Sequence, residues 1–312
     1  MIERRSSRRI ALALVIAAVC LMPAVPAGQA MFDRDKTPRQ PRATSWLAKK
    51  KTLPPYTTPR TPWGEPDLRG FYADNGISSD NIERIEDWLD PATPPSETFI
   101  VDPADGKVPY QPWALEQRNR HRFGLARGWT GETGEKLYVD PQTFCLTTVP
   151  RMSWRGNFQI LQTPGYVFIN MDWGHSYRII PTTRGRSDLA ANVKLALGDS
   201  RGRWEGNTLV IEVTNLDGKQ WIDSIGNFYS DNAKITERWT LADARTIDYQ
   251  VTIEDPTVYT QPWTMNVPLV RREPLELWEH ACHEGNGHHI EGTQALGFKW
   301  YQVPRPPAAP AR

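Results

Sequence analysis

The chain has 312 residues, and its 37 lysine and arginine side chains nearly balance 36 aspartates and glutamates, so its formal net charge at pH 7 is +1. This balance gives no electrostatic footprint for nucleic acid, and no basic amphipathic stretch suits a membrane surface. The 27 prolines argue against a helical protein, while the 13 tryptophans are typical of strand cores or of a surface that binds carbohydrate or aromatic rings.

Residues 1–30 have the pattern of a secretory signal peptide. A basic start is followed by the apolar run 10–22, which only Cys20 interrupts, and then by small residues and prolines. The apolar run is too short to cross a bilayer as a helix. Ser7-Arg8-Arg9 matches a twin-arginine signal in part, but an ordinary general-secretion leader is favoured. The pattern predicts a periplasmic or secreted protein with no stable membrane insertion after cleavage.

Residues 31–150 are rich in proline and broken in pattern. We expect an extended segment that wraps another part of the protein instead of folding alone. Within it, residues 64–72 are predicted to form a turn that leads into a short strand, and residues 114–122 are the best helix candidate.

From residue 158 onward the sequence changes to short strands and turns. Residues 245–254 alternate strictly between apolar and polar side chains, which has no good helical explanation. Residues 202–214 read as a hairpin, and Pro268 indicates an edge or a bulge in its strand. The other predicted strands are 158–162, 166–173, 176–181, 234–241, 261–271 and 275–283.

The even spacing of these strands predicts an all-β fold, an antiparallel up-and-down barrel of about eight strands like that of lipocalins and other calycins. A barrel of this size can hold one small ligand. A β-sandwich is the alternative. The predicted organisation is a signal peptide (1–30), a proline-rich segment with a short helix (31–150), a barrel domain (151–303) and a disordered tail (304–312).

Two cysteines remain once the leader is removed, Cys145 and Cys282. In an oxidising compartment, a pair far apart in sequence is most simply a disulfide. Closing so long a loop is worth roughly 4 kcal/mol in the chain-entropy model. The alternative is a thiolate that serves as a metal ligand or a nucleophile.

Three polar side chains, Asp172, His175 and Arg178, lie close together across a predicted tight hairpin. A carboxylate beside a histidine raises the pKa of the ring and fixes its tautomer, as a general base requires. The alternative interpretation is a polar turn whose charges face water.

Glu237 lies on the same face of its predicted strand as Ile235 and Trp239. A carboxylate that points into a barrel is either paired, for instance with Arg178 or Arg203, or acts as an acid with a raised pKa. The sequence leaves both readings open.

The run 280–289 holds four histidines, a cysteine and a glutamate, which invites a metal site that includes His283 and Glu284 with a partner such as His175. The spacing of His283 and His288 does not suit a zincin helix, so a glycine-rich surface loop is favoured. The sequence has no P-loop, no dinucleotide glycine fingerprint and no Gly-x-Ser-x-Gly elbow. We therefore expect no cofactor, with a metal as the alternative.

Several separate motifs resemble a large family of secreted bacterial β-rich proteins to which no activity is assigned. The matches, in order, are PDLRG (66–70), QTPGYV (162–167), GRWEGNTLV (202–210), Asp255-Pro256 with Pro262-Trp263-Thr264, and CHEGN (282–286). The resemblance covers most of the chain from Pro62 and implies a shared β-rich fold but no substrate. It also implies structural or functional roles for Arg203, Trp204, Glu205, His283 and Glu284.

Three functions are open, and the last of them is a periplasmic protein that binds a metal through His283, Glu284 and a partner such as His175. In the first, the barrel binds a small organic molecule with aromatic walls and a few polar contacts. The side chains expected to bind are Trp173, Trp239, Trp263, Arg178 and Arg203. In the second, the same scaffold is a cofactor-independent lyase, isomerase or hydrolase. The side chains expected to catalyse are His175, Asp172 and Glu237.

Overall fold

The computed structural model describes residues 43–73, 82–83, 98–123, 138–151, 157–183, 185, 187–272, 277, 280–284, 286–288, 291–292 and 305–307. The chain divides into two compact units, residues 1–40 and 41–312, and the fold described below is that of the second. The predicted signal peptide and most of the predicted tail lie outside the described residues. No helix in the described ranges is long and apolar enough to cross a membrane.

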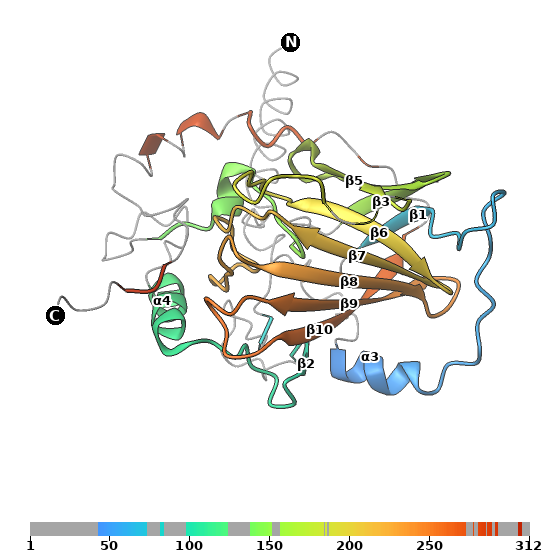
Figure 1. The fold of residues 1–312 in the computed structure, drawn as a ribbon, viewed down its shortest axis with the longest axis horizontal. Helices are drawn as coiled ribbons and strands as arrows, with labels where there is room; N and C mark the ends of the chain where they lie inside the picture. The colour runs from blue at the N-terminus through green and yellow to red at the C-terminus, as the bar shows by residue number, and fades with distance from the viewer. Residues whose placement is uncertain are drawn as a thin grey trace, which may run out of the picture. The chain divides into compact units, whose positions relative to one another are not determined.

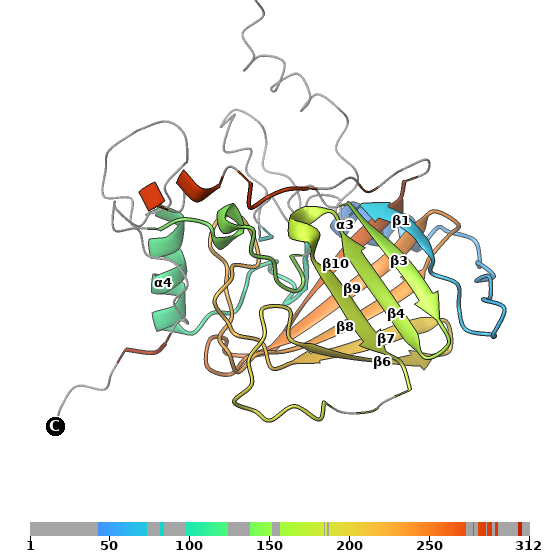
Figure 2. The same ribbon diagram turned by 90° about the horizontal axis from the view of Figure 1, so that it is seen from above.

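Nine antiparallel strands form a nearly closed barrel, which confirms the predicted all-β barrel with one strand more than expected (Figures 1 and 2). Their order around the barrel is β5-β4-β3-β1-β10-β9-β8-β7-β6, and β2 pairs with β10 outside this path. The strands are β1 (Gly70–Ala73), β2 (Ile100–Asp102), β3 (Asn157–Thr163), β4 (Tyr166–Met171), β5 (Tyr177–Pro181), β6 (Asp199–Glu205), β7 (Thr208–Thr214), β8 (Lys234–Leu241), β9 (Thr246–Glu254) and β10 (Trp263–Arg271).

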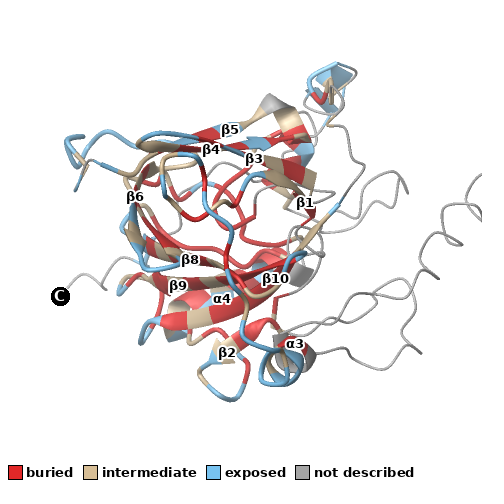
Figure 3. Ribbon diagram, turned by 90° about the vertical axis from the view of Figure 1, so that its right-hand side faces the viewer, coloured by how far each residue is buried: buried red, intermediate tan, exposed pale blue. Residues whose placement is uncertain are grey.

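Alternating side chains explain why these segments form barrel strands. In β8, Ile235, Glu237, Trp239 and Leu241 are buried, and the residues between them are partly exposed. Successive side chains of a strand point to opposite faces, so one set fills the interior and the other meets solvent. Figure 3, which views the barrel from the end where the hairpins turn, shows this ring of half-buried strands.

The proline-rich segment supplies part of the wall, which corrects the predicted barrel boundary at residue 151. β1 lies between β3 and β10, and it pairs Tyr72 with both Phe158 and Arg271. β2 pairs with β10 nearer its start, at Thr264 and Met265. The barrel therefore begins at residue 70. A strand of four residues has too little alternation for its pattern to reveal it.

β10 keeps its register with β9 through Pro268, where the sequence predicted an edge or a bulge, and its register shift lies in the pairing with β2, between Thr264 and Met265. β1 pairs with the end of β10 and β2 with its start, so Pro268 lies between the two paired segments. Proline has no backbone N–H to give to a neighbouring strand. On its other side β10 pairs with β9 in full register, with Pro268 opposite Asp248.

The N-terminal segment also covers the outer wall of the barrel. Helix α3 (Ala43–Lys50) lies outside the barrel beside β10, as Figures 1 and 3 show. The indole Nε1 of its buried Trp46 donates to Oδ1 of Asp248 on β9 at 2.8 Å. The amide of Asn266 on β10 donates to the same oxygen at 2.9 Å. This contact explains why both faces of β9 and β10 are buried here.

The hairpin end is the end of the barrel where β3–β4, β6–β7 and β8–β9 turn, and residues 66–68 close it. The Leu68 side chain is fully buried, and its backbone N–H donates to Oε1 of Gln162 at 2.7 Å. The Gln162 amide in turn donates to the Pro66 carbonyl at 3.1 Å. A side chain that satisfies two backbone groups fixes this segment against β3.

The loop end is the opposite end, where the longer connections lie. Helix α4 (Pro112–Phe123), which confirms the predicted helix, lies at this end with the connections before β8 and β10 (Figure 2). Asn227 accepts from the Tyr110 hydroxyl at 2.9 Å and from Arg118 Nε at 3.1 Å. The strand predicted at 275–283 is not formed at its described residues, Leu277 and 280–283.

His121 on α4 should make the protein lose stability in mild acid. Burial lowers the pKa of His121 from 6.5 to about 4. Its Nδ1 lies 3.0 Å from the Gly226 carbonyl and its Nε2 lies 2.8 Å from the Gln117 amide, which suits a neutral ring. Because the unfolded chain binds the proton more readily, stability present above pH 6.5 is lost as the pH falls toward 4, by about 3 kcal/mol.

Urea unfolding at pH 7.5 and at pH 4.5 tests this expectation. The acid-induced loss should shrink in His121→Phe, which removes the titrating ring. His283→Ala, which removes an exposed histidine, should show the same loss as the unchanged protein. Equal losses in the protein and in His121→Phe would show that His121 does not cause the acid sensitivity.

Candidate functional site

An ion pair crosses the interior of the barrel from β5 to β8. Arg178 donates to both carboxylate oxygens of Glu237, with Nη1 to Oε1 at 3.1 Å and Nη2 to Oε2. The two side chains are 1% and 0% exposed. Of the two partners that the sequence suggested for Glu237, the structure shows Arg178.

Two further side chains complete this network. The Tyr249 hydroxyl on β9 donates to Oε1 of Glu237 at 2.5 Å, and Nη2 of Arg178 donates to the Ser200 hydroxyl on β6 at 2.9 Å. The sequence interpretation missed both residues. The alternation of β9 does put Tyr249 on the inner face, but nothing in the sequence shows which polar group it meets there.

The charged groups of Arg178 and Glu237 are buried. Burial by itself would lower the pKa of Arg178, but the attraction and hydrogen bonds of Glu237 outweigh it and leave that pKa raised. Arg178 therefore stays protonated and the pair has no net charge. Glu237 accepts three hydrogen bonds, two from Arg178 and one from Tyr249.

Aromatic side chains fill the interior beside the ion pair. The Trp239 ring lies 4.6 Å from the Tyr249 ring and 6.0 Å from the Phe158 ring, measured between centroids. Because β8 and β3 are on different sides of the barrel, the contact with Phe158 places Trp239 in the interior. Trp263 is also fully buried, and its ring lies 5.7 Å from Tyr259 toward the loop end.

Among the residues that the structure describes, several buried polar atoms of the interior have no hydrogen-bond partner. They are Nε of Arg178, Nε1 of Trp204, Nε1 of Trp239 and Oγ1 of Thr182. Trp204 shares the inner face of β6 with Ser200 and Gly202. Leaving a buried donor unpaired costs about 1 to 3 kcal/mol, so native proteins seldom do so without a reason.

Side-chain packing, not a described strand ladder, brings β5 and β6 together. A Cβ on Gly202 would lie 2.9 Å from Cγ2 of Ile180 and 3.2 Å from Cγ2 of Thr182. The absence of a side chain at Gly202 therefore lets β5 approach β6 closely. This is the seam of the nearly closed barrel, and Arg178, Thr182 and Trp204 all lie on the strands or turn that border it.

The turn predicted to hold a catalytic pair lies away from this network. Asp172 precedes a short 3-10 helix, η3 (Trp173–His175), and the His175 side chain lies outside what the structure describes. Trp173 packs with Cys145 and Cys282, and its ring centroid is 4.4 Å from that of His280. Trp173 thus belongs to the packing around the disulfide and not to the aromatic lining near Trp239, contrary to its expected role.

Arg203 lies on the outside of the barrel, which corrects its expected role as a binding residue. It forms ion pairs with Glu205 at 3.0 Å and with Glu212 at 2.8 Å, and all three side chains are at least one-third exposed. On β6 the inner face carries Ser200, Gly202 and Trp204, so Arg203 must point outward.

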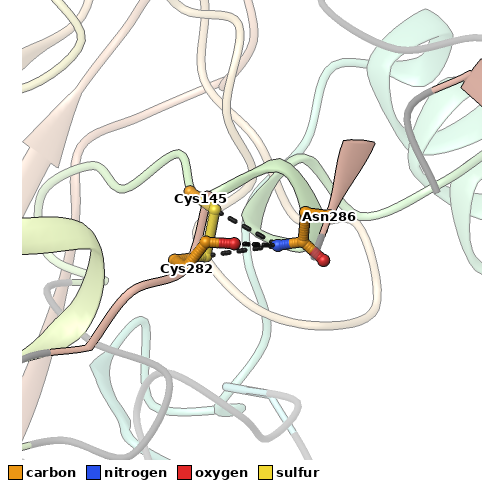
Figure 4. Close-up of a disulfide and its surroundings, with 3 residues drawn as sticks. All are labelled: Cys145, Cys282 and Asn286. Carbon is orange, nitrogen blue, oxygen red and sulfur yellow. Dashed lines mark hydrogen bonds between the residues drawn. A yellow bond between two sulfur atoms is a disulfide. The ribbon is translucent and has the colours of Figure 1, made fainter. Parts of the chain in front are cut away.

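The predicted disulfide between Cys145 and Cys282 is present, which removes the thiolate alternative (Figure 4). The Asn286 amide donates to the Cys282 carbonyl at 2.5 Å and lies 3.3 Å from Sγ of Cys145. His283 and Glu284 are exposed. In the described parts of the chain, no three His, Cys, Asp or Glu side chains are placed to hold a metal ion.

No family model, no curated protein and no solved structure matches this chain. The resemblance to secreted β-rich proteins stays a prediction.

Proposed function

We propose that this protein is exported and that its barrel binds one small organic molecule. The unpartnered donors of Arg178, Trp204 and Trp239 on the inner wall carry the proposal. Ligand pockets usually combine aromatic walls with a few polar groups that fix the orientation of the ligand. A ligand oxygen beside these donors would supply the partners that they lack in the protein.

The pairing of Glu237 favours binding over catalysis. A general base needs a lone pair that is free to take a proton in the operating pH range. Both Glu237 oxygens already accept hydrogen bonds from Arg178 or Tyr249. We therefore expect Glu237 to hold the interior in shape instead of reacting.

The disulfide supports the exported part of the proposal. Such bonds persist in oxidising compartments such as the bacterial periplasm and are rare in the cytosol. Together with the leader pattern of residues 1–30, the bond between Cys145 and Cys282 points to a protein that works outside the cytoplasm.

A ligand screen with a matched pair of variants tests the binding function. A molecule that binds only the folded state raises its unfolding temperature, and we expect such a rise in the oxidised protein with small aromatic or alicyclic compounds. Trp239→Phe removes one donor and keeps an aromatic ring. Since one hydrogen bond contributes about 0.5 to 1.5 kcal/mol, the Kd should rise about twofold to tenfold.

The control is Trp63→Phe, which removes an indole N–H that donates to Glu65 at 2.8 Å outside the barrel. This variant should bind the same ligand as the unchanged protein does. Native mass spectrometry should show one ligand per chain. If Trp239→Phe and Trp63→Phe bind alike, the ligand does not lie in the barrel and the proposal fails.

A further inference from the structure

We infer that the outer face of β1, β3, β4 and β5 is a contact surface between two copies of this chain, which form a reversible twofold dimer. This uncharged face consists of the side chains that the four strands direct away from the barrel interior. It is independent of the proposed ligand, because it lies on the outer wall. Three of its properties point to a second copy: exposed apolar side chains, a lack of charge, and a contrast with the other walls.

The centre of the uncharged face is a row of apolar side chains on neighbouring strands. Leu161 on β3 pairs with Phe168 on β4, which in turn pairs with Ile179 on β5. The residues on either side of each one along its strand are buried, so these three side chains point outward. Leu161 is 44% exposed and Ile179 is 50% exposed, so solvent reaches the row.

Aromatic side chains border this row on the same face. Tyr166 and Phe168 are two residues apart on β4, and their rings stack with centroids 6.1 Å apart. Tyr177 on β5 is 63% exposed, and Phe71 on β1 is partly exposed. Among the barrel strands that the structure describes, only β3 and β5 carry large apolar side chains that are exposed. Such side chains need no explanation when scattered, but gathered on one face they mark a contact surface.

None of the outward side chains of these four described strands is charged. Polar positions of the face carry uncharged groups, such as the amides of Gln159 and Asn170, which pair with each other across β3 and β4. A partner that brought a charged group here would bury it without a counter-charge, which is unfavourable. The partner surface must therefore also be uncharged, which disfavours nucleic acid and strongly acidic or basic peptides.

The other walls of the barrel favour a second copy that uses the same face. The outer side of β6, β7 and β8 carries ion pairs among Arg203, Glu205, Glu212 and Arg238. Helix α3 packs on β10, and Figure 3 shows β3, β4 and β5 on the opposite side of the barrel from α3. Among these described walls, the uncharged face is matched in charge only by itself. Two copies therefore meet face to face about a twofold axis, each contributing the same residues.

The size of the uncharged face makes this a weak dimer. Four strands about 4.8 Å apart, each about 15 to 20 Å long, give a face of about 300 to 400 Å². A standard stable interface buries about 800 Å² per partner, so the two copies should dissociate on dilution. Two such sheets would pack with their strands within about 30° of each other. The row of Leu161, Phe168 and Ile179 would then form the dry centre of the contact.

Sedimentation velocity of the oxidised protein from about 5 µM to about 1 mM tests the dimer, and we expect monomer at the low end and dimer at the high end. Ile179→Lys, and separately Leu161→Lys, should raise the dimer Kd about tenfold or more by burying a charge in the contact. Both positions are exposed in the single chain, and a cooperative urea transition checks that the variants fold. The matched control is Thr236→Lys, which adds the same charge to the outer side of β8 and should dimerise like the unchanged protein.

Three outcomes would overturn the inference. The first is a protein that stays monomeric at the highest concentration. The second is a dimer that both lysine variants form as readily as Thr236→Lys does, since another surface would then hold it. The third is a monomer that binds uncharged phosphatidylcholine vesicles and loses this binding in Ile179→Lys, which would assign the face to a lipid surface. Ligand binding inside the barrel is decided separately, by Trp239→Phe and Trp63→Phe.

Discussion

Replacement of Glu237 by Gln should destabilise the protein by about 3 to 5 kcal/mol, because it leaves Arg178 as an uncompensated charge inside the barrel. Arg178→Met should cost a similar amount, because it leaves the Glu237 carboxylate as an uncompensated charge inside the barrel. Neither charge can reach water, since both side chains are buried. Urea unfolding at pH 7 measures each loss as a lower midpoint with an unchanged slope.

The double variant Arg178→Met with Glu237→Gln distinguishes the charge effect from loss of packing. Replacing a buried ion pair by uncharged groups of similar size is often close to neutral. The double variant should therefore be more stable than either single variant. Tyr249→Phe, which removes the hydroxyl that donates to Glu237 and leaves both charges in place, should cost less than Glu237→Gln. Additive single losses would show that the two charges do not depend on each other.

Removal of the disulfide should lower the free energy of unfolding by about 4 to 5 kcal/mol. Cys145 and Cys282 are 137 residues apart, and closing so long a loop removes much of the freedom of the unfolded chain. The double variant Cys145→Ala with Cys282→Ala should unfold at a much lower urea concentration than the oxidised protein. Adding dithiothreitol to the unchanged protein should produce a similar shift.

Dithiothreitol added to the double alanine variant is the matched control and should have no effect. The loss should also leave the buried network of Arg178 and Glu237 in place, because the disulfide belongs to a separate packing cluster with Trp173. A loss below about 1 kcal/mol would mean that the unfolded chain is already compact in this region.

The sequence predicted the barrel because strand periodicity is a local signal. β9 alternates over its whole length, and its inner residues, such as Tyr249, are buried as the pattern predicts. The predicted disulfide also depended on few alternatives, since only two cysteines follow the predicted leader. The barrel and the disulfide could both be predicted without knowing which distant strands pair with each other.

The site could be predicted only in part, because it depends on contacts between segments that are far apart in the sequence. Periodicity placed Glu237 on an inner face, but the choice between Arg178 and Arg203 required the strand order and the outward direction of Arg203. Trp173 and Trp239 look alike in sequence. Only the three-dimensional fold separates the tryptophan beside the disulfide from the tryptophan in the barrel interior.

The position of β1 between β3 and β10 has a consequence for how the chain folds. Ala73 on β1 pairs with Val270 on β10, so the first strand of the barrel wall pairs with the last. The wall is therefore not continuous until β10 has been made. Contacts between such distant residues slow folding. A chain that is synthesised in order from its N-terminus would keep its barrel wall open between β3 and β10 until β10 had been made.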